Sequence, residues 1–166
     1  DSLVFTYQGD GDFASIGLAE SIPAANRGEN ITVIFINNGI YGMTGGQMAP
    51  TTLVGQNSTT TPGGRNPDKV GFPIRMAERI AGLEAPVFVA RAAMNNPKNV
   101  MQAKKIIKKS FELQMENKGY TFVELLSSCP TNWNMTPPAA AEWMNEHTIK
   151  YFPLGVYKDT YHVMEE

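Results

Sequence analysis

The chain has 166 residues, of which 42% are hydrophobic and 18% are charged, and its formal net charge is −2. This length and balance suit one globular domain and exclude global disorder. The near-neutral charge provides no electrostatic basis for nucleic acid as a main partner. A single cysteine, Cys129, excludes an internal disulfide framework and a cysteine-ligated metal cluster built by this chain alone. It also favours a reducing, cytoplasmic compartment.

No apolar run of the sequence approaches the roughly 20 residues of a membrane span, so we expect no membrane partner. A signal peptide is not recognisable either. The chain starts at Asp1 and enters an apolar segment almost at once. We therefore expect that an upstream segment is missing.

Strands and helices are predicted to alternate along the chain. Buried or partly buried strands are expected at residues 3–7, 31–36, 87–90 and 120–126. Helices are expected at residues 13–26, 68–83, 97–117 and 137–147. The first strand is interpreted as buried, and the near-continuous apolarity of the second is typical of a parallel sheet.

The segment from residue 39 to residue 67 shows no helix or strand pattern, and loops of this length are usually functional or disordered. The tail after residue 147 is mixed. Because the sequence has no internal repeat and no linker, it predicts a single α/β domain over residues 1–166 with a mainly parallel sheet.

Polar residues follow the first two predicted strands. Gly9-Asp10-Gly11-Asp12 follows the first strand, and Asn37-Asn38 follows the second. Ligands of open α/β sheets bind at the carboxyl ends of the strands, so the two clusters would face each other if the strands are neighbours. A carboxylate from Asp10, an amide oxygen from Asn38 and a nearby backbone carbonyl would suit Mg²⁺ together with a phosphate. A helix beginning near Asp12 would favour the same phosphate.

The glycine-rich cluster has three other interpretations. Asp-Gly pairs can be simple turn chemistry, although the second polar cluster weakens this reading. The spacing of Gly9, Gly11 and Ala14 also fits a dinucleotide-binding fingerprint, but the two aspartates would then face a pyrophosphate without a counter-charge. A calcium loop starting at Asp10 fails, because serines stand where that loop requires glycine and glutamate.

The two polar clusters resemble the thiamine-diphosphate-binding motif, in which Gly-Asp-Gly is separated from Asn-Asn by 25 to 30 residues. Here twenty-five residues lie between Gly11 and Asn37. Nearly the whole chain is similar to the β subunits of 2-oxoacid:ferredoxin oxidoreductases. The segments that carry this similarity are residues 37–47, Pro50-Thr51-Thr52, Cys129-Pro130-Thr131-Asn132-Trp133 and residues 153–158.

This resemblance implies a three-layer thiamine-diphosphate-binding fold and a set of site residues. The side chains of Asp10 and Asn38 and the backbone carbonyl of Ile40 would bind Mg²⁺. The residues expected around the cofactor are Gly9, Asp10, Gly11, Asp12, Asn38, Ile40, Thr44, Gly45, Gly46 and Gln47. No residue of the chain is assigned to catalysis, because the family's activating glutamate comes from a separate pyrimidine-binding domain.

The resemblance also implies an activity and a set of partners. A 2-oxoacid, either 2-oxoglutarate or a branched-chain one, would be oxidatively decarboxylated to acyl-CoA and CO₂. Coenzyme A would accept the acyl group, and electrons would pass through iron–sulfur clusters, which this segment does not ligate, to ferredoxin. An α subunit with the pyrimidine-binding domain and a ferredoxin-like subunit would complete the enzyme, and this chain would not act alone.

The alternatives are a non-oxidative thiamine-diphosphate decarboxylase or synthase and a non-catalytic interaction subunit with the same fold. A nicotinamide-binding domain is a further, less favoured hypothesis.

Other conspicuous residues receive less specific interpretations. Cys129 is expected to be structural, and His147 and His162 are expected at the surface. The lysines of the third helix predict a solvated face: Lys98, Lys104, Lys105, Lys108 and Lys109. Four methionines are expected to fill the core: Met76, Met94, Met101 and Met115. Arg65 and Asn66 could meet a substrate or a partner subunit, and the sequence does not decide between these roles.

Overall fold

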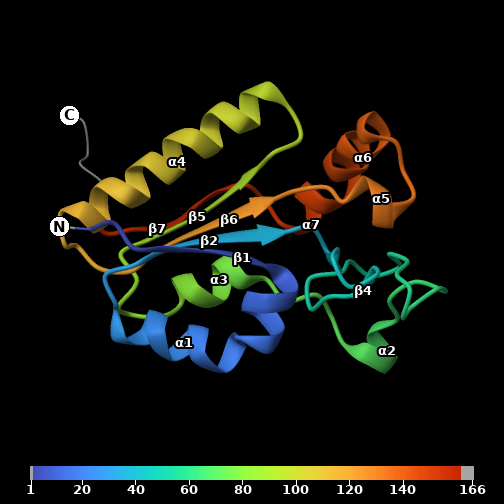
Figure 1. Ribbon diagram of the computed structural model, residues 1–166, viewed down its shortest axis with the longest axis horizontal. Helices are drawn as coiled ribbons and strands as arrows, with labels where there is room; N and C mark the ends of the chain where they lie inside the picture. The colour runs from blue at the N-terminus through green and yellow to red at the C-terminus, as the bar shows by residue number, and fades with distance from the viewer. Residues whose placement is uncertain (1, 162–166) are drawn as a thin grey trace.

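The computed structural model describes residues 2–161 and consists of three layers, with a five-stranded sheet between helices on its two faces (Figure 1). The strand order is β1-β2-β6-β5-β7. The strands span Phe5–Gly9 (β1), Thr32–Asn37 (β2), Thr121–Leu126 (β6), Phe88–Ala93 (β5) and Gly155–Asp159 (β7). All neighbouring pairs are parallel except β5 with β7, so the predicted three-layer fold with a mainly parallel sheet is confirmed.

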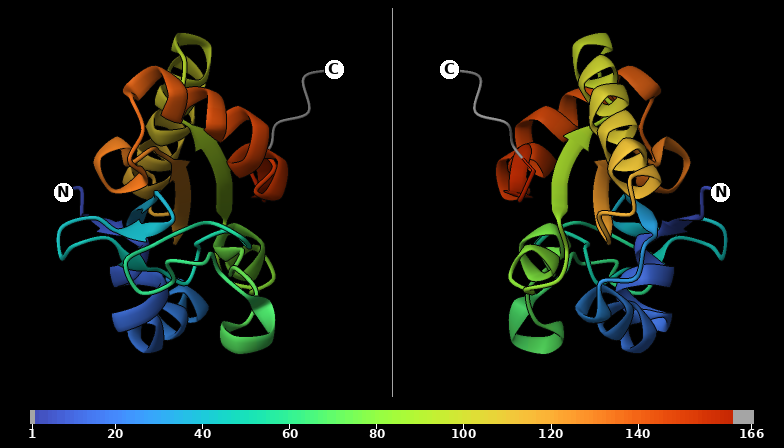
Figure 2. Two further views of the ribbon diagram at one scale, coloured as in Figure 1. Left: turned by 90° about the vertical axis from the view of Figure 1, so that its right-hand side faces the viewer. Right: turned by 90° about the vertical axis from the view of Figure 1, so that its left-hand side faces the viewer.

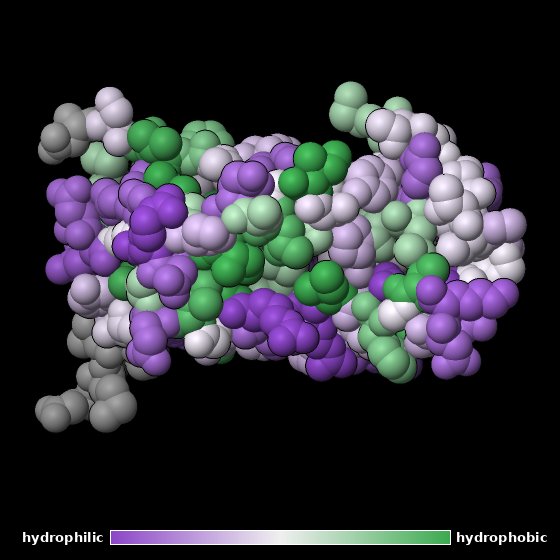
Figure 3. All heavy atoms as spheres, turned by 90° about the horizontal axis from the view of Figure 1, so that it is seen from below, coloured by the Kyte–Doolittle hydropathy of each residue, from purple (hydrophilic) through white to green (hydrophobic). Residues whose placement is uncertain are grey.

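One long helix, α4 (Pro97–Met115), covers one face of the sheet, and α1 (Leu18–Arg27) and α3 (Met76–Ala81) cover the other (Figures 1 and 2). On the surface over α1 and α3, apolar residues form a broken band between polar edges (Figure 3). The remaining short elements are β3 (Ile40–Tyr41), β4 (Gln47–Met48), α2 (Pro67–Val70), α5 (Pro130–Trp133), α6 (Pro137–Trp143) and α7 (Ile149–Tyr151). Two single π-helical turns span Asp12–Ile16 and Met144–Thr148.

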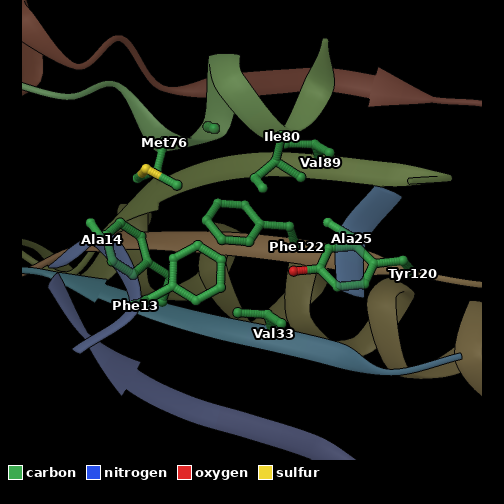
Figure 4. Packing of buried hydrophobic residues seen from close by; sticks show 11 residues of the cluster. Phe13, Ala14, Ala25, Val33, Met76, Ile80, Val89, Tyr120 and Phe122 are labelled. Carbon is green, nitrogen blue, oxygen red and sulfur yellow. The ribbon is translucent and has the colours of Figure 1, made fainter. Parts of the chain in front are cut away.

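A cluster of buried apolar side chains holds the sheet to α1, α3 and the π-helical turn before α1 (Figure 4). The rings of Phe13, Phe35 and Phe122 lie 5.3–5.6 Å apart, centroid to centroid, and all three are almost fully buried. Every residue of β5 and β6 is buried, because these strands lie in the middle of the sheet with helices on both sides. Fully burying a Val, Leu or Phe side chain contributes about 1.5–3 kcal/mol, so the residues of these types in β5 and β6 stabilise the fold substantially.

The first strand differs from the prediction of a buried strand. It spans Phe5–Gly9, and Phe5 and Tyr7 are 51% and 71% exposed. The reason is topological, because β1 lies at the edge of the sheet with β2 as its one neighbour. Strand propensity alone does not distinguish an edge strand from a central one.

The predicted helix at residues 68–83 is divided into α2 and α3, because Pro73 lacks a backbone N–H and cannot continue a helix. The long segment before it contains the small β3–β4 hairpin. The mixed tail provides α7 and the fifth strand, β7. The expectation of four core methionines is wrong for three of them, because Met76 is buried whereas Met94, Met101 and Met115 are 42–55% exposed.

Within residues 2–161, no helix combines the length and the apolarity that crossing a membrane requires.

Candidate functional site

The two polar clusters come together at one end of the sheet. Strands β1 and β2 are parallel neighbours, and Gly9 pairs with Ile36. Asp10 and Asn38, which follow these residues closely, therefore lie at the same edge, as the sequence predicted for adjacent strands. In Figure 1 the β3–β4 segment and α5 lie beyond this edge, and the left view of Figure 2 looks onto it.

Asp10 lies at the centre of this cluster and is only 2% exposed. One carboxylate oxygen, Oδ2, accepts hydrogen bonds from the Gly39 amide at 2.7 Å and from the Thr51 hydroxyl at 2.5 Å. The other, Oδ1, accepts from the Gly11 amide at 2.9 Å. These partners are neutral, so the described residues give the buried carboxylate no positive charge.

The environment of Asp10 changes its acidity. Burial raises the pKa of the carboxyl group from 3.8 to about 6, although the hydrogen bonds from Thr51, Gly39 and Gly11 each lower it. Perturbed carboxyl groups of this kind concentrate at functional sites. At neutral pH the group is mostly ionised, and a cation beside it would offset the cost of its burial.

Asn38 and Ile40 form the second side of the cluster. The Asn38 side chain is half-buried, and its Oδ1 atom accepts a hydrogen bond from the Ile40 amide at 3.0 Å. Ile40 is buried and begins β3, which pairs with β4 as a two-residue antiparallel hairpin. The turn after Asn38 is therefore fixed both by its own side chain and by the Gly39 contact with Asp10.

Two glycines of the predicted site are required by close contacts. A Cβ atom on Gly11 would lie 2.3 Å from the ring of Tyr41, and the Tyr41 hydroxyl donates to the Gly11 carbonyl at 3.2 Å. At Gly46, where φ is +81°, a Cβ would lie 2.8 Å from Oδ1 of Asn132. By contrast, a Cβ on Gly9 would meet no atom within 4 Å. The hairpin is thus packed tightly against its neighbours, and the space beside Gly9 is open.

The other predicted site residues do not contact Asp10 or Asn38. Asp12 is exposed, lies in the π-helical turn and accepts from Nε2 of Gln8 at 3.1 Å. Thr44 donates through its hydroxyl to Oε1 of Gln47 at 2.7 Å, and Gln47 donates back to the Thr44 carbonyl at 3.0 Å. Gly45 is exposed between them. These residues shape the loop of the hairpin.

Sequence reasoning assigned no role to three residues that the structure places in this cluster. Thr51 bonds to Asp10, and the Thr52 hydroxyl donates to the Gly39 carbonyl at 2.6 Å. The Asn132 amide donates to the Gly42 carbonyl at 3.0 Å and to Sγ of Cys129 at 3.1 Å. The polar Pro50-Thr51-Thr52 segment inside an otherwise structureless region was the available signal, but its partners are distant in sequence.

Arg65 has a structural environment. It is only 5% exposed and donates to six backbone carbonyls of the surrounding loop: those of Ala49, Pro50, Thr52, Val70, Gly71 and Phe72. Its neighbour Asn66 caps α2 by accepting from the Asp68 amide at 2.9 Å. Arg65 therefore holds together the segment that carries Thr51 and Thr52.

The expectations for histidine and lysine are partly confirmed. His147 is exposed and stacks on Trp143, whereas His162 lies outside the described residues. Most lysines of α4 are solvated as expected, but Lys109 is half-buried and pairs with Asp159 of β7.

The fold and the cluster define an α/β domain with a buried carboxylate and an asparagine at the ends of two adjacent parallel strands. A family model described as "Thiamine pyrophosphate enzyme, C-terminal TPP binding domain" matches residues 1–125, and the chain belongs to this family. The match supports the thiamine interpretation over the dinucleotide-binding one.

Proteins of similar sequence indicate which enzymes of this family the chain resembles. The chain is 50% identical over 159 residues to "Ketoisovalerate oxidoreductase subunit VorA" of Methanothermobacter thermautotrophicus, covering 96% of this chain and 33% of that protein. It is 35% identical over 154 residues to "2-oxoglutarate synthase subunit KorB" of Methanocaldococcus jannaschii, covering 90% and 53%. The expected resemblance to subunits of 2-oxoacid oxidoreductases is therefore confirmed.

A solved structure supports the same family. It is described as 2-oxoglutarate:ferredoxin oxidoreductase from Magnetococcus marinus with 2-oxoglutarate, coenzyme A and succinyl-CoA bound. The TM-score is 0.68 at 27% identity, and the match covers 93% of this chain and 56% of that one. The chain thus spans between a third and just over half of the length of these proteins.

Proposed function

We propose that this chain is the diphosphate-binding part of a 2-oxoacid:ferredoxin oxidoreductase, which converts a 2-oxoacid to acyl-CoA and CO₂ and passes electrons to ferredoxin. One observation carries this proposal. In a domain of the thiamine pyrophosphate enzyme family, Asp10 is a buried carboxylate without a counter-charge, next to Asn38 at the ends of adjacent strands.

The residues at this site fit a magnesium ion bound with a diphosphate. Mg²⁺ prefers oxygen ligands and is usually held by one or two carboxylates together with the phosphates of its ligand. Asp10 has the required charge. Its Oδ2 atom already accepts two hydrogen bonds, whereas Oδ1 accepts one and can take a further partner. The open space at Gly9 lets a diphosphate approach the backbone.

In this proposal each residue has a separate task. The Asp10 carboxylate, the Asn38 side-chain oxygen and the Ile40 carbonyl hold the ion, and the hydrogen bond to Oδ1 of Asn38 orients that side chain. Gly9, Gly11 and Asp12 lie along the diphosphate, with the hairpin residues Thr44, Gly45, Gly46 and Gln47 facing it. Thiamine diphosphate, when bound, supplies the nucleophilic carbon that decarboxylation of a 2-oxoacid requires.

The rest of the enzyme would come from other parts and subunits. An α subunit with a pyrimidine-binding domain would provide the activating glutamate, and a ferredoxin-like subunit would carry iron–sulfur clusters to ferredoxin. The similarity to VorA at 50% identity, against 35% to KorB, favours a branched-chain 2-oxoacid over 2-oxoglutarate. Coenzyme A would accept the acyl group. This assignment is tested by comparing ferredoxin reduction with 2-oxoisovalerate and with 2-oxoglutarate.

The cofactor site is tested by calorimetric titration of thiamine diphosphate into the purified assembly that contains this chain, stripped of cofactor, with and without Mg²⁺. Asp10→Asn is the test variant. Asp68→Asn, which removes an exposed carboxylate from α2, is the matched control. We expect the unmodified assembly and the control to bind only with Mg²⁺, and Asp10→Asn to bind at least about tenfold more weakly.

Two results would refute the proposal. One is the absence of binding to the unmodified, cofactor-free assembly with Mg²⁺ present. The other is binding that neither needs Mg²⁺ nor changes in Asp10→Asn.

A further inference from the structure

A buried ionic network lies beside the candidate site and has no task in the proposed function. Glu124 of β6 is fully buried, and its Oε2 atom accepts from Nε of Arg91 at 2.9 Å and from the Ala77 amide at 3.2 Å. Arg91 of β5 also bonds to Glu78 of α3, at 2.5 Å between Nη2 and Oε2. The network thus connects two central strands with the helix that covers them.

Further contacts fix Arg91 on its other sides. It donates to the Pro153 carbonyl at 3.1 Å and to the Tyr157 hydroxyl, and its guanidinium carbon lies 4.9 Å from the centre of the Tyr157 ring. Burial alone would lower the pKa of Arg91, but Glu124 and Glu78 raise it, so the guanidinium stays charged. Such a network is rigid because every charge in it has a partner.

The network reaches the candidate site through Asn37. The Oε1 atom of Glu124, which is not used by Arg91, accepts from Nδ2 of Asn37 at 2.7 Å. Asn37 is only 1% exposed and is the last residue of β2. Its side chain lies on the face of the sheet that carries Phe35, because alternate residues of a strand share a face. The paired asparagines therefore have different partners.

The position of Asn37 determines where the next residues lie. Its carbonyl accepts from the Ser127 amide at 2.9 Å, so both its backbone and its side chain are held by the segment of β6 and its end. Asn38 follows at once, and the Gly39 amide then donates to Asp10. The end of β2 is thus fixed on one side of Asn38, and the contact of Gly39 with Asp10 fixes the chain on its other side.

We propose that Asn37, held by Glu124 of the buried network, is a positioning residue that sets the geometry of the Asp10–Asn38 metal site. This inference rests on the proposed function, because it assigns Asn37 a task only if Asp10 and Asn38 hold Mg²⁺ with thiamine diphosphate. Partners that orient metal ligands without touching the metal commonly affect affinity, and their loss costs about 10–100-fold.

The test separates positioning from stability with two variants of the same strand, prepared in the full assembly. Asn37→Ala removes the donor to Glu124. Thr32→Ala is the matched control, because Thr32 is also fully buried in β2 and its hydroxyl donates to Oε1 of Gln114 at 2.9 Å. Thr32 lies five residues earlier, roughly 17 Å along the strand. Asn37→Ala loses the bond to Glu124, and Thr32→Ala loses the bond to Gln114 together with the one that its hydroxyl accepts from Thr121, but only Asn37 is next to the site.

The readouts are the thermal midpoint without cofactor and the Mg²⁺ concentration that half-saturates thiamine diphosphate binding. We expect both variants to lower the midpoint, and Asn37→Ala alone to raise the Mg²⁺ requirement at least about tenfold. If Asn37→Ala does not fold, Asn37→Ser, which keeps a shorter donor, is measured instead with the same expectation of direction.

Equal Mg²⁺ requirements in the Asn37 variant and the Thr32 control would overturn the inference while leaving the proposed function intact, provided that the unmodified assembly binds. Failure of the unmodified assembly to bind thiamine diphosphate with Mg²⁺ would overturn both.

Discussion

Replacing Asp10 by asparagine should stabilise the cofactor-free protein while it destroys the proposed site. Burial raises the pKa of this carboxyl group from 3.8 to about 6. A tenfold change in proton affinity corresponds to about 1.4 kcal/mol, so ionising Asp10 in the folded chain costs up to about 3 kcal/mol. Asparagine carries no charge, and its oxygen can still accept from the Gly39 amide and the Thr51 hydroxyl, although its NH₂ group cannot accept from the Gly11 amide.

The size of the stabilisation depends on pH. Between about pH 4 and pH 6 the folded state keeps a proton on Asp10 that the unfolded state has released, so the free energy of unfolding falls as the pH rises. Above pH 6 the full cost is present, and below pH 4 it vanishes. Allowing for imperfect hydrogen bonding of the amide, we expect Asp10→Asn to gain about 1–3 kcal/mol at pH 8 and little at pH 4.

Urea unfolding of both proteins in the presence of a chelator, at pH 8 and at pH 4, measures this difference. With Mg²⁺ and thiamine diphosphate added, the order should reverse, because ligand that binds only the folded state stabilises the unmodified protein. The reasoning fails if Asp10→Asn is less stable than the unmodified protein by the same amount at both pH values.

Four further substitutions test the packing around the site and in the core. Gly11→Ala should lower stability by about 1–3 kcal/mol, because its methyl group meets the Tyr41 ring, whereas Gly9→Ala in open space should leave the thermal midpoint of the cofactor-free protein unchanged. Arg65→Met should cost about 2–4 kcal/mol in urea unfolding, since it leaves buried carbonyls without a donor; an unchanged midpoint would contradict the role given to Arg65. Phe122→Ala should cost about 3–5 kcal/mol, because its ring packs between Phe13 and Phe35, and calorimetric unfolding measures the loss.

The central elements and the two polar clusters could be predicted from the sequence. Apolar runs of strand length and the turn-forming residues after them are local signals, and the structure places strands and helices close to the predicted ranges. The composition of the segment carrying Thr51 and Thr52 marks it as unusual but predicts no structure for it. Its order depends on Arg65, whose six carbonyl partners lie mostly outside helices and strands and follow no periodic pattern.

The paired asparagines show what a local sequence pattern cannot predict. In the sequence Asn37 and Asn38 are equivalent, whereas in the structure one bonds to Glu124 and the other lies beside Asp10 and Ile40. The expectation that β1 is buried failed for a similar reason, because its place at the edge of the sheet depends on the order of all five strands.

The sequence by itself determined the alternation of strands and helices and the two segments that meet at the site, because these depend on composition and spacing along the chain. It also indicated the family, through the resemblance of its motifs to those of known enzymes. Only the tertiary structure decided which strands are neighbours, that Asp10 is buried without a counter-charge, and that Glu124 and Arg91 hold the end of β2. These properties arise from contacts between residues that are tens of positions apart. Burial and pairing depend on the arrangement of the whole chain, which no local pattern encodes.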